Sequence, residues 1–323
     1  FVRQFTPEKL ALATDVVARS ETLHLVAERL RQAMQERTLA PATRLEAGLL
    51  LDDLRSQHGL TPDGLDAFLP VPGTDFAIGK YPATNAQFRR FVDAGGYGEK
   101  AGQRPAWWSE AGWRYRQSEG WTAPHYWDNR KWNHDTQPVV GVSWYEAEAY
   151  CKWLNLTVAG HGYKPERMTA QLPTQEQWML AARNGQTTVP GDKVDYPWRR
   201  RWPRSTARRP TTVPGDKVDY PWSSAFDATR ANTEESNLQQ TTPVDMYPDG
   251  ATPVGACDLA GNVWEWTADT TDKDRVAFWL KGGSWHDPES KARASAAAYG
   301  RLDWSDRYAY FGFRLVCVPV SHG

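Results

Sequence analysis

Cysteine is scarce in this chain. The three cysteines, Cys151, Cys257 and Cys317, lie far apart in the 323-residue sequence and form no Cys-x-x-Cys pair. Zinc ribbons and thioredoxin-type redox sites need such pairs, so the spacing argues against both. An odd cysteine count fits a reducing compartment better than a disulfide framework, which favours a cytoplasmic location. We expect three buried free thiols that pack as small apolar side chains.

Long apolar runs and net charge are lacking as well. No apolar run approaches the roughly 18 to 20 residues that span a bilayer, and no basic-then-apolar signal segment opens the chain. Because the chain starts with Phe1 rather than Met, removal of a targeting segment stays open. The net charge of −1 gives no overall field for nucleic acid. We therefore expect no membrane span and no specific nucleic-acid partner.

Helix signals are present, first in an N-terminal segment that we place at residues 1–69. Thr6-Pro7-Glu8 puts an N-cap residue before a proline that suits the first helical position. Apolar residues recur at helical spacing over 23–30 in the next segment, and a third helix is expected over about 42–56. Two interpretations stay open for these helices: a docking element, or an extension that packs on the main domain.

Residues 70–323 have a different sequence pattern, which predicts short strands, many turns and a few well-marked helices. Three capping-box patterns, in which a Ser or Thr precedes a Glu or Gln by three residues, stand before apolar or aromatic runs. They are Thr84-x-x-Gln87, Ser143-x-x-Glu146 and Thr174-x-x-Gln177, and they predict helices over 85–93, 144–155 and 175–183. The residues alone therefore indicate an irregular α+β domain.

One duplication interrupts this domain. Residues 187–198 recur letter for letter at 211–222, and the stretch between the copies, 199–210, carries six arginines and no acid. The stretch is either a basic patch for phosphate groups or a solvated loop. Like charges repel and nothing apolar anchors them, so we expect residues 187–222 to form a disordered insert.

Three blocks near the C-terminus are the most informative motifs. They are Gly261-Asn-Val-Trp-Glu-Trp266, Lys281-Gly-Gly-Ser-Trp285 and Gly312-Phe-Arg-Leu315. Between Ser284 and Phe313 there is no cysteine, and the interval is rich in side chains suited to making contacts.

Seven blocks in order resemble the formylglycine-generating enzyme or sulfatase-modifying-factor family. They are Tyr81–Phe88, Gln137–Trp144, Gln171–Trp178, Thr242–Asp245, Gly261–Trp266, Gly282–Trp285 and Gly312–Arg314. The resemblance covers roughly residues 70–318. It implies a C-type-lectin-like α+β fold with short strands, few helices and long structured loops.

The metal chemistry that the resemblance implies is incomplete here. The family's oxidases use a copper-binding cysteine pair just after the Gly-Gly-Ser-Trp block, because thiolates are soft ligands for Cu(I). In this chain that stretch, 286–291, has no thiol. The related sulfoxide synthases add an N-terminal three-histidine iron site, but only His24 and His58 precede residue 125. We therefore expect no copper, no iron and no enzyme activity.

Calcium is the one metal that the resemblance leaves open. The family's calcium ligands match Asp258, Gly261, Val263 and Glu265, two carboxylates and two backbone carbonyls, which are the hard oxygens that calcium takes. A second family site would match Asn232, Thr233, Ser236 and Leu238, where Ser236 replaces an aspartate. The alternative for Asp258 and Glu265 is a loop hydrogen-bonding role without metal.

The domain also resembles the variable proteins of diversity-generating retroelements. In those proteins the C-terminal interval between the Gly-Gly-Ser-Trp and Gly-Phe-Arg motifs is mutated, while the motifs stay fixed. From Arg301 to Tyr310, every residue except Trp304 is one that such mutagenesis yields, and no Asn follows Ser284. An ordinary polar loop is the alternative. The resemblance implies a diversified ligand-binding surface, which comprises Trp285, His286, Asp287, Ser290, Tyr299, Arg301, Leu302, Asp303, Trp304, Ser305, Asp306, Arg307, Tyr308 and Tyr310.

The leading hypothesis is a non-catalytic protein that binds an unidentified macromolecular ligand, either a variable protein or another partner. Tyrosine and tryptophan offer rigid contact area at low rotamer cost, and the arginines and aspartates add charge-directed specificity. Two rivals remain: an oxidase of the formylglycine-generating or sulfoxide-synthase type, and a regulatory module of a larger assembly that docks through residues 1–60. No residue pair in the sequence has a spacing that demands a general acid and base.

Overall fold

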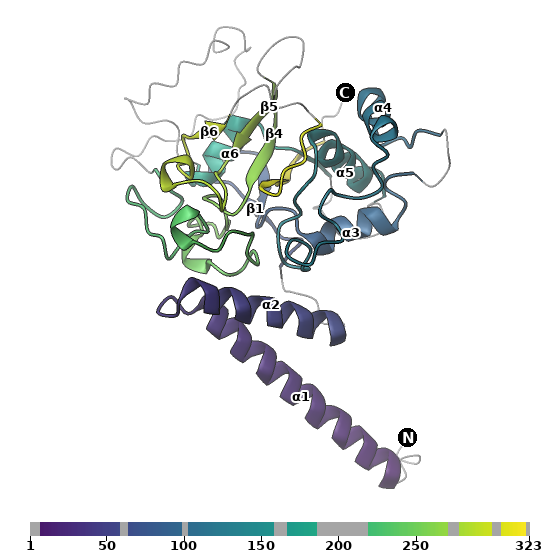
Figure 1. The fold of residues 1–323 in the computed structure, drawn as a ribbon, viewed down its shortest axis with the longest axis vertical. Helices are drawn as coiled ribbons and strands as arrows, with labels where there is room; N and C mark the ends of the chain where they lie inside the picture. Colours follow the sequence, from purple (N-terminus) through teal and green to yellow (C-terminus); the bar gives the residue numbers. More distant parts are fainter. Residues whose placement is uncertain are drawn as a thin grey trace.

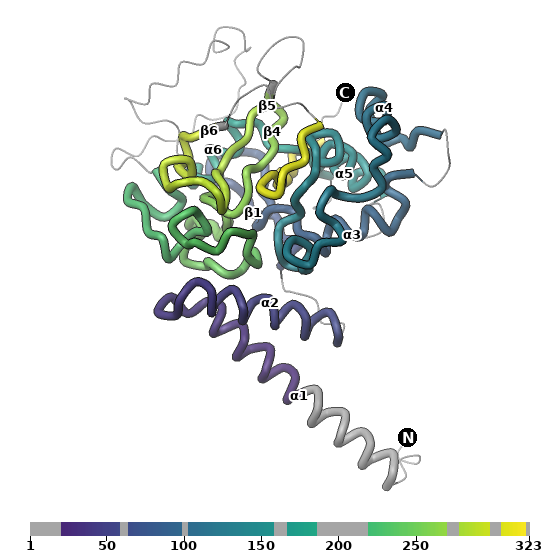
Figure 2. The backbone as a smooth tube through the Cα atoms, viewed as in Figure 1, coloured from purple at the N-terminus to yellow at the C-terminus, as the bar shows by residue number. Residues whose placement is uncertain are grey.

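The computed structural model describes residues 7–58, 64–98, 103–157, 167–185, 219–270, 278–298 and 305–320. Within these ranges, the side chains of residues 7–20, 270 and 298 are not described. The structure consists of two N-terminal helices and a body of short helices, two small sheets and long loops (Figures 1 and 2). This is the α+β fold, with short strands and few helices, that the sequence predicted.

The N-terminal helices α1 (Pro7–Gln35) and α2 (Pro41–His58) form an antiparallel pair, and α1 extends away from the body (Figure 1). The prediction of three helices before residue 59 is wrong within the described residues, because α1 is continuous. No proline or glycine lies inside the α1 sequence to end the helix between its two predicted parts.

Helix α2 is joined to the body by buried polar contacts. Arg44 donates from Nε to the Met34 carbonyl at 2.8 Å and from Nη2 to the Met246 carbonyl at 2.6 Å. The Asp52 carboxylate accepts from the backbone N–H of Thr136 at 2.8 Å and from its hydroxyl at 2.7 Å. Both Arg44 and Asp52 are buried, so α2 packs on the body, as the second interpretation of the N-terminal segment proposed.

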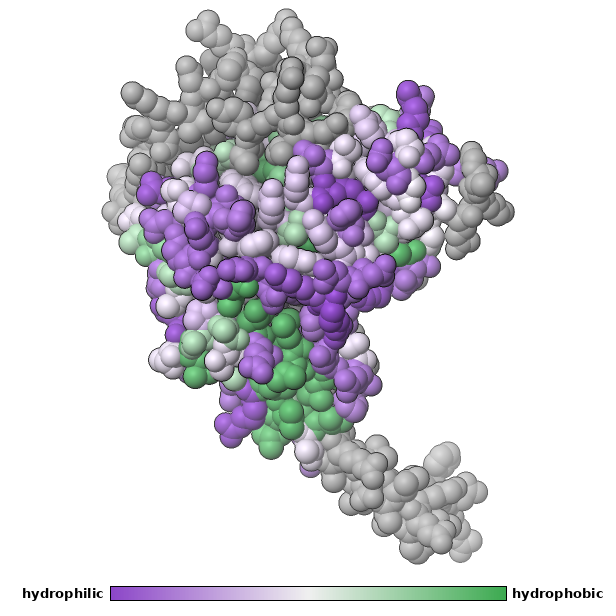
Figure 3. All heavy atoms as spheres, viewed as in Figure 1, coloured by the Kyte–Doolittle hydropathy of each residue, from purple (hydrophilic) through white to green (hydrophobic). Residues whose placement is uncertain are grey.

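The outer face of the helix pair is partly apolar. Figure 3 shows this apolar area below the body, and the exposed large apolar side chains of the two helices and their connection are Leu25, Val26, Leu39 and Leu50. None of the helices in the described part of the chain combines the length and apolarity of a membrane span. The docking interpretation therefore stays open for this outer face.

The first sheet has the order β1-β2-β8-β3 and is antiparallel throughout. Its strands are β1 (Phe68–Pro70), β2 (Ala77–Gly79), β3 (Met168–Gln171) and β8 (Val316–Pro319). The C-terminal strand β8 lies between β2 and β3, so the end of the chain is built into the middle of the sheet.

The second sheet positions the C-terminal motifs. It has the order β6-β5-β4-β7, with strands β4 (Trp264–Thr270), β5 (Phe278–Lys281), β6 (Ala297–Ala298) and β7 (Phe311–Phe313). Strand β4 pairs with β5 antiparallel and with β7 parallel, in the register Glu265↔Lys281 and Glu265↔Gly312. All three C-terminal blocks therefore meet at one strand.

The helices of the body confirm the capping predictions. They are α3 (Asn85–Asp93), α4 (Glu110–Ser118), α5 (Trp144–Thr157) and α6 (Gln175–Ala182), with short 3₁₀ helices η2 (Glu234–Ser236), η3 (Pro248–Gly250) and η4 (Glu289–Lys291). The capping boxes at Thr84 and Thr174 are formed as expected. Helix α4 was not predicted, because Ser109 caps it without a Glu or Gln three residues later.

The core of the body is rich in aromatic side chains. Fully or nearly fully buried rings interlock between α3, α5 and β7: Phe88 stacks on Tyr150 at 5.4 Å, and Phe313 meets both at 5.5–6.1 Å. All three cysteines are buried and free, as predicted.

The duplicated insert lies mostly outside the described residues, since only 219–222 of the predicted 187–222 are described. In these four residues Tyr220 is buried and stacks on Trp222 at 5.6 Å, and the Asp219 carbonyl accepts from the N–H of Ala294. The prediction of disorder is therefore wrong for the end of the insert, because its aromatic residues pack on the body.

Candidate functional site

A continuous chain of aromatic rings joins three segments that are far apart in the sequence. We call it the aromatic strip, and it consists of His125, Tyr126, Trp132, Trp285, His286, Tyr310 and Tyr308. Neighbouring ring centroids lie 4.7, 6.0, 5.5, 5.2, 5.9 and 5.3 Å apart in that order. Four of these residues belong to the predicted ligand-binding surface, which the structure therefore brings together in part.

The Tyr308 end of the strip is a small ladder of nearly parallel rings. The planes of Tyr308 and Tyr310 differ by 8°, and those of Tyr310 and His286 differ by 23°. Tyr308 and Tyr310 are two residues apart just before β7, in a turn that the N–H of Phe311 closes by donating to the Tyr308 carbonyl at 3.1 Å. Tyr308 and His286 are exposed, whereas Tyr310 between them is partly buried.

Backbone hydrogen bonds hold the strip in place. The N–H of Gly141 donates to the Tyr308 carbonyl at 3.0 Å, and that of Trp264 donates to the Tyr310 carbonyl at 2.9 Å. The indole of Trp285 donates to the Ala309 carbonyl at 3.2 Å. Trp132 is buried, Tyr126, Trp285 and Tyr310 are partly buried, and His125, His286 and Tyr308 are exposed. The exposed part of the strip is therefore a pre-formed surface, which lowers the ordering cost of binding.

Arg307 belongs to the interior rather than to the contact surface that the sequence predicted. Its guanidinium pairs with the fully buried Glu146 at 3.0 Å, donates to the carbonyls of Gly141 and Ala123, and lies 4.7 Å from the ring centroid of Trp121. It therefore positions the loop that carries Tyr308 and Tyr310. The sequence could not show this role, because the partners of Arg307 are more than 160 residues away.

Asp287 is also a structural residue. Its Oδ2 accepts from the Trp264 indole at 2.8 Å and from the Ser284 hydroxyl, and its carbonyl accepts from the N–H of Glu234 at 2.9 Å. The carboxylate still contributes negative charge near the strip. Burial, followed by the neighbouring Tyr308, Asp287 and Asp306, raises the pKa of Tyr310.

The remaining predicted surface residues divide into two groups. Ser290 is exposed on η4, and Ser305 and Asp306 are half-buried beside the ring ladder. Tyr299, Arg301, Leu302, Asp303 and Trp304 lie outside the described residues.

Sequence reasoning missed His125, Tyr126 and Trp132. They lie in a tryptophan-rich loop with no local motif, and the tilted ring contact of Trp132 with Trp285 becomes visible only in the fold. The segment's high aromatic content was the one available signal.

Glu265, a predicted calcium ligand, is committed to a buried ion pair. Its carboxylate accepts from Arg314 Nη2 at 2.8 Å and Nε at 3.1 Å, and from the Trp178 indole at 2.6 Å, with both charged side chains fully buried. A guanidinium at this distance occupies the place of a cation. Glu265 therefore does not fit as a calcium ligand, and the calcium prediction rests on Asp258 and the carbonyls of Gly261 and Val263.

Asp258 takes part in a hydrogen-bonded loop. Burial raises its pKa to about 8, and its Oδ2 accepts from Asn262 Nδ2 at 3.4 Å. Asn262 also accepts from the N–H of Thr242 at 3.0 Å and donates to the Thr242 carbonyl at 3.2 Å. In the described part of the chain, no group of three His, Cys, Asp or Glu side chains is arranged to hold a metal. Calcium binding stays a prediction.

The oxygens of the second family calcium position are hydrogen-bonded within the loop. Ser236 Oγ lies 2.8 Å from Asn232 Oδ1 and 2.8 Å from the Thr233 carbonyl. The serine that replaces the family's aspartate therefore contacts the oxygens that would have bound a cation.

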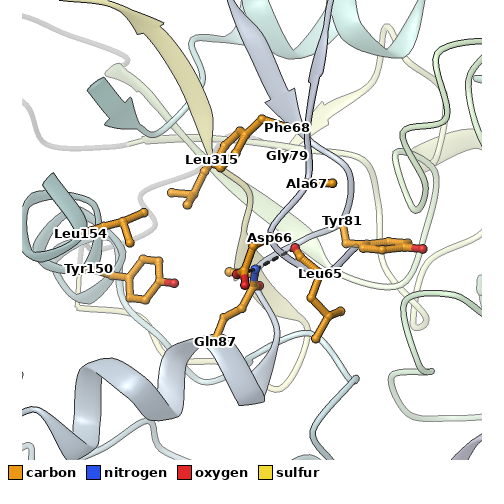
Figure 4. Close-up of a pocket in the computed structure, with 11 residues that line it drawn as sticks. Leu65, Asp66, Ala67, Phe68, Gly79, Tyr81, Gln87, Tyr150, Leu154 and Leu315 are labelled. Carbon is orange, nitrogen blue, oxygen red and sulfur yellow. Dashed lines mark hydrogen bonds between the residues drawn. The ribbon is translucent and has the colours of Figure 1, made fainter. Parts of the chain in front are cut away.

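A hollow of about 340 Å³, counting space open to solvent, lies between β1, β2, α3 and α5 (Figure 4). Gln87 donates to the Leu65 carbonyl and to Asp66, which also pairs with Arg90 at 3.0 Å. The lining of the hollow shares no residue with the aromatic strip. Because Asp66 and Gln87 already satisfy each other, the strip is the stronger candidate site.

Fold and site together define a mixed α+β domain with a pre-formed aromatic surface next to its C-terminal strand motifs. Residues 36–318 match the family described as the sulfatase-modifying factor enzyme 1-like domain, and the chain belongs to this family. The matched range includes α2, so the family resemblance begins earlier than the predicted boundary at residue 70.

Known relatives include enzymes and a protein named as inactive. Hercynine oxygenase of Mycolicibacterium smegmatis is 31% identical over 227 residues, which are 68% of this chain and 42% of the relative. Inactive C-alpha-formylglycine-generating enzyme 2 of Mus musculus is 29% identical and covers 70% of both chains. The chain thus spans less than half of the hercynine oxygenase that it matches.

The solved structure of Treponema denticola variable protein 1 is similar with a TM-score of 0.46 and 16% identity, covering 79% of this chain and 93% of that chain.

The expectation that the chain is not an enzyme is contradicted by these comparisons, because relatives 31–33% identical are named as an oxygenase. The inference from the missing thiols was too broad. The missing copper-binding cysteine pair argues against the copper-dependent oxidase reaction and leaves other reactions of the family open.

Proposed function

We propose that the chain recognises a macromolecular ligand through the aromatic strip. The observation that carries the proposal is the contact chain of seven rings from three segments, fixed by backbone hydrogen bonds at Tyr308 and Tyr310. Tyrosine and tryptophan dominate binding energy at protein interfaces, because they bury a large area with few rotatable bonds. The ligand's identity is open, and its recognition is compatible with further chemistry in a larger protein.

Selection from a random peptide display library on the immobilised chain tests this proposal. We expect enriched peptides to bind the wild type at least about tenfold more tightly than a Tyr308→Ser/Tyr310→Ser variant, since truncating central aromatic contacts costs about 2 kcal/mol or more. Leu156→Ser is the matched control, because Leu156 is exposed and apolar but lies outside the strip. Equal binding to the double variant, or failure to enrich any peptide, would exclude the strip as a recognition surface.

A second candidate function is supported by the relatives. We propose as the alternative that the chain binds the substrate of an oxygenase, as the 31% identity to a hercynine oxygenase suggests. Calorimetric titration with hercynine, with oxygen uptake as a second readout, tests it. Saturable hercynine binding that Tyr310→Ser abolishes would place a small substrate at the strip. No heat and no uptake would remove this alternative and leave the first proposal unaffected.

Two further expectations stay proposals. The free cysteines fit a reducing compartment such as the cytoplasm. Calcium binding at Asp258 would appear as a rise in melting temperature on adding calcium that Asp258→Asn abolishes. A melting temperature that calcium leaves unchanged would remove it.

A further inference from the structure

We propose that the Tyr308 end of the aromatic strip selects arginine side chains on a protein ligand. This inference rests on the proposed function and specifies the chemistry of the partner.

The exposed ring of Tyr308 is available to a planar cation at this end, whereas Tyr310 is stacked between Tyr308 and His286. The Tyr308 side chain is exposed, and the 8° angle between the Tyr308 and Tyr310 planes presents the two rings in one orientation. A guanidinium is planar and weakly hydrated, and it stacks on tyrosine and tryptophan faces with both cation–π and dispersion attraction. The ammonium of lysine is more strongly hydrated and has no plane to match.

Two carboxylates lie near Tyr310 at this end. In addition to burial and the neighbouring phenols of Tyr308 and Tyr126, Asp287 and Asp306 act to raise the pKa of Tyr310. The nearby cation, Arg307, is turned inward to Glu146, which neutralises it. A positively charged ligand group therefore gains Coulomb attraction at Tyr310, whereas an acidic one is repelled.

The middle of the strip already holds a cation. Lys131 Nζ lies 4.9 Å from the ring centroid of Trp132. This contact within the chain illustrates the interaction that we infer for the tyrosine end. It also places a positive charge beside Trp132, so the arginine site is assigned to the tyrosine end alone.

The form of the surface favours an arginine within a polypeptide. Small ligands bind tightly in concave pockets that bury most of their area, and the hollow of Figure 4 has none of the strip's residues in its lining. The exposed rings of the strip give a free cation few contacts. A peptide that places an arginine on Tyr308 can also contact the exposed rings of His286 and His125, and so adds area without a pocket.

The test uses two defined peptides, acetyl-Arg-Gly-Arg-amide and the same peptide with citrulline in place of arginine. Citrulline keeps the size and planarity of the side chain and removes its charge. Binding is followed by the indole N–H signals of the tryptophans in ¹H–¹⁵N spectra. We expect saturable shifts with the arginine peptide and at least about tenfold weaker binding of the citrulline peptide.

Variants locate the site. We expect Tyr310→Leu and Asp306→Asn each to weaken binding of the arginine peptide about fivefold or more, while Tyr310→Phe, which keeps the ring, retains it. Lys131→Gln is the matched control beside Trp132, away from the tyrosines, and we expect no loss. Melting temperatures within a few degrees of the wild type establish that the variants are folded.

Equal affinity for the two peptides, no binding of either, or arginine binding that survives Tyr310→Leu would overturn the inference. These outcomes are distinct from failure of the proposed function. Library peptides that need Tyr308 and Tyr310 but lack arginine would leave the strip as a recognition surface and remove only its selectivity for arginine.

Discussion

Neutralising Glu265 provides a demanding test of how the C-terminal motifs are held together. The substitution Glu265→Gln keeps the size of the side chain and removes its charge. Arg314 then remains fully buried, with carbonyl partners at Gly79 at 2.9 Å and Cys257 at 2.7 Å but without the charged carboxylate that contacts it. Removing one member of a buried ion pair costs about 3–5 kcal/mol, because the other charge stays desolvated and uncompensated.

The assay is urea-induced unfolding followed by tryptophan fluorescence. We expect Glu265→Gln to lower the free energy of unfolding by about 3–5 kcal/mol. The double variant Glu265→Gln/Arg314→Met should lose about 1–3 kcal/mol less than the sum of the two single losses, because groups in direct contact do not act independently. This difference measures the interaction between Glu265 and Arg314 itself. It is separate from the cost of leaving the carbonyl partners of Arg314 without a donor.

The experiment also separates the ion pair from a calcium role. If Glu265 held calcium, EDTA would destabilise the wild type and would have little effect on Glu265→Gln. We expect EDTA to leave the loss caused by Glu265→Gln unchanged. A loss of unfolding free energy below about 1 kcal/mol is typical of an exposed ion pair. Such a small loss would refute the reasoning, because it would show that the Glu265–Arg314 pair does not stabilise the fold as a buried pair does.

Three further predictions concern polar groups at other buried positions. Arg307→Met should lower the free energy of unfolding by about 3 kcal/mol, because Glu146 loses its buried counter-charge, and thermal unfolding would measure it; an unchanged melting temperature would contradict the inward position of Arg307. Burial raises the pKa of Asp52 from 3.8 to about 7, so the folded state binds the proton more tightly than the unfolded state. The stability contributed by protonated Asp52 should therefore be present in full below pH 3.8 and be lost as pH rises through 7, and the difference between wild type and Asp52→Asn in urea titrations should show this slope. Burial lowers the pKa of Lys281 to about 7, so the difference between wild type and Lys281→Met should slope the opposite way, with stability lost as pH falls through 7.

Local features were predictable from the sequence, whereas the site depended on distant contacts. The capping boxes at Thr84 and Thr174 lie within four residues, so short-range hydrogen bonding fixed α3 and α6. The inward position of Arg307 depends on Glu146, 161 residues away, and no local pattern encodes that pairing. The family resemblance supplied the fold, but it pointed to Glu265 as a metal ligand, where the ion pair with Arg314 competes for the same oxygens.

The aromatic strip, too, depends on contacts between distant segments that the local sequence does not show. Tyr308 and Tyr310 were predicted from their place between fixed motifs, and the structure brings them together with His286. Trp132 joins through a tilted ring contact with Trp285 across a separation of more than 150 residues. Composition indicated an aromatic-rich chain, but only the fold determines which rings enter the core and which lie at the surface.

Strand β4 pairs with β5 on one side and with β7 on the other, so both ends of the segment from Gly282 to Tyr310 are attached to the same strand. The distance between these ends is set by the sheet and not by the intervening residues. Foreign side chains could therefore be introduced at exposed positions between β5 and β7 if Asp287 and Arg307, which bind Trp264 and Glu146, are kept. The Glu265–Arg314 pair would then serve as an internal check that the exchange has left the two sheets intact.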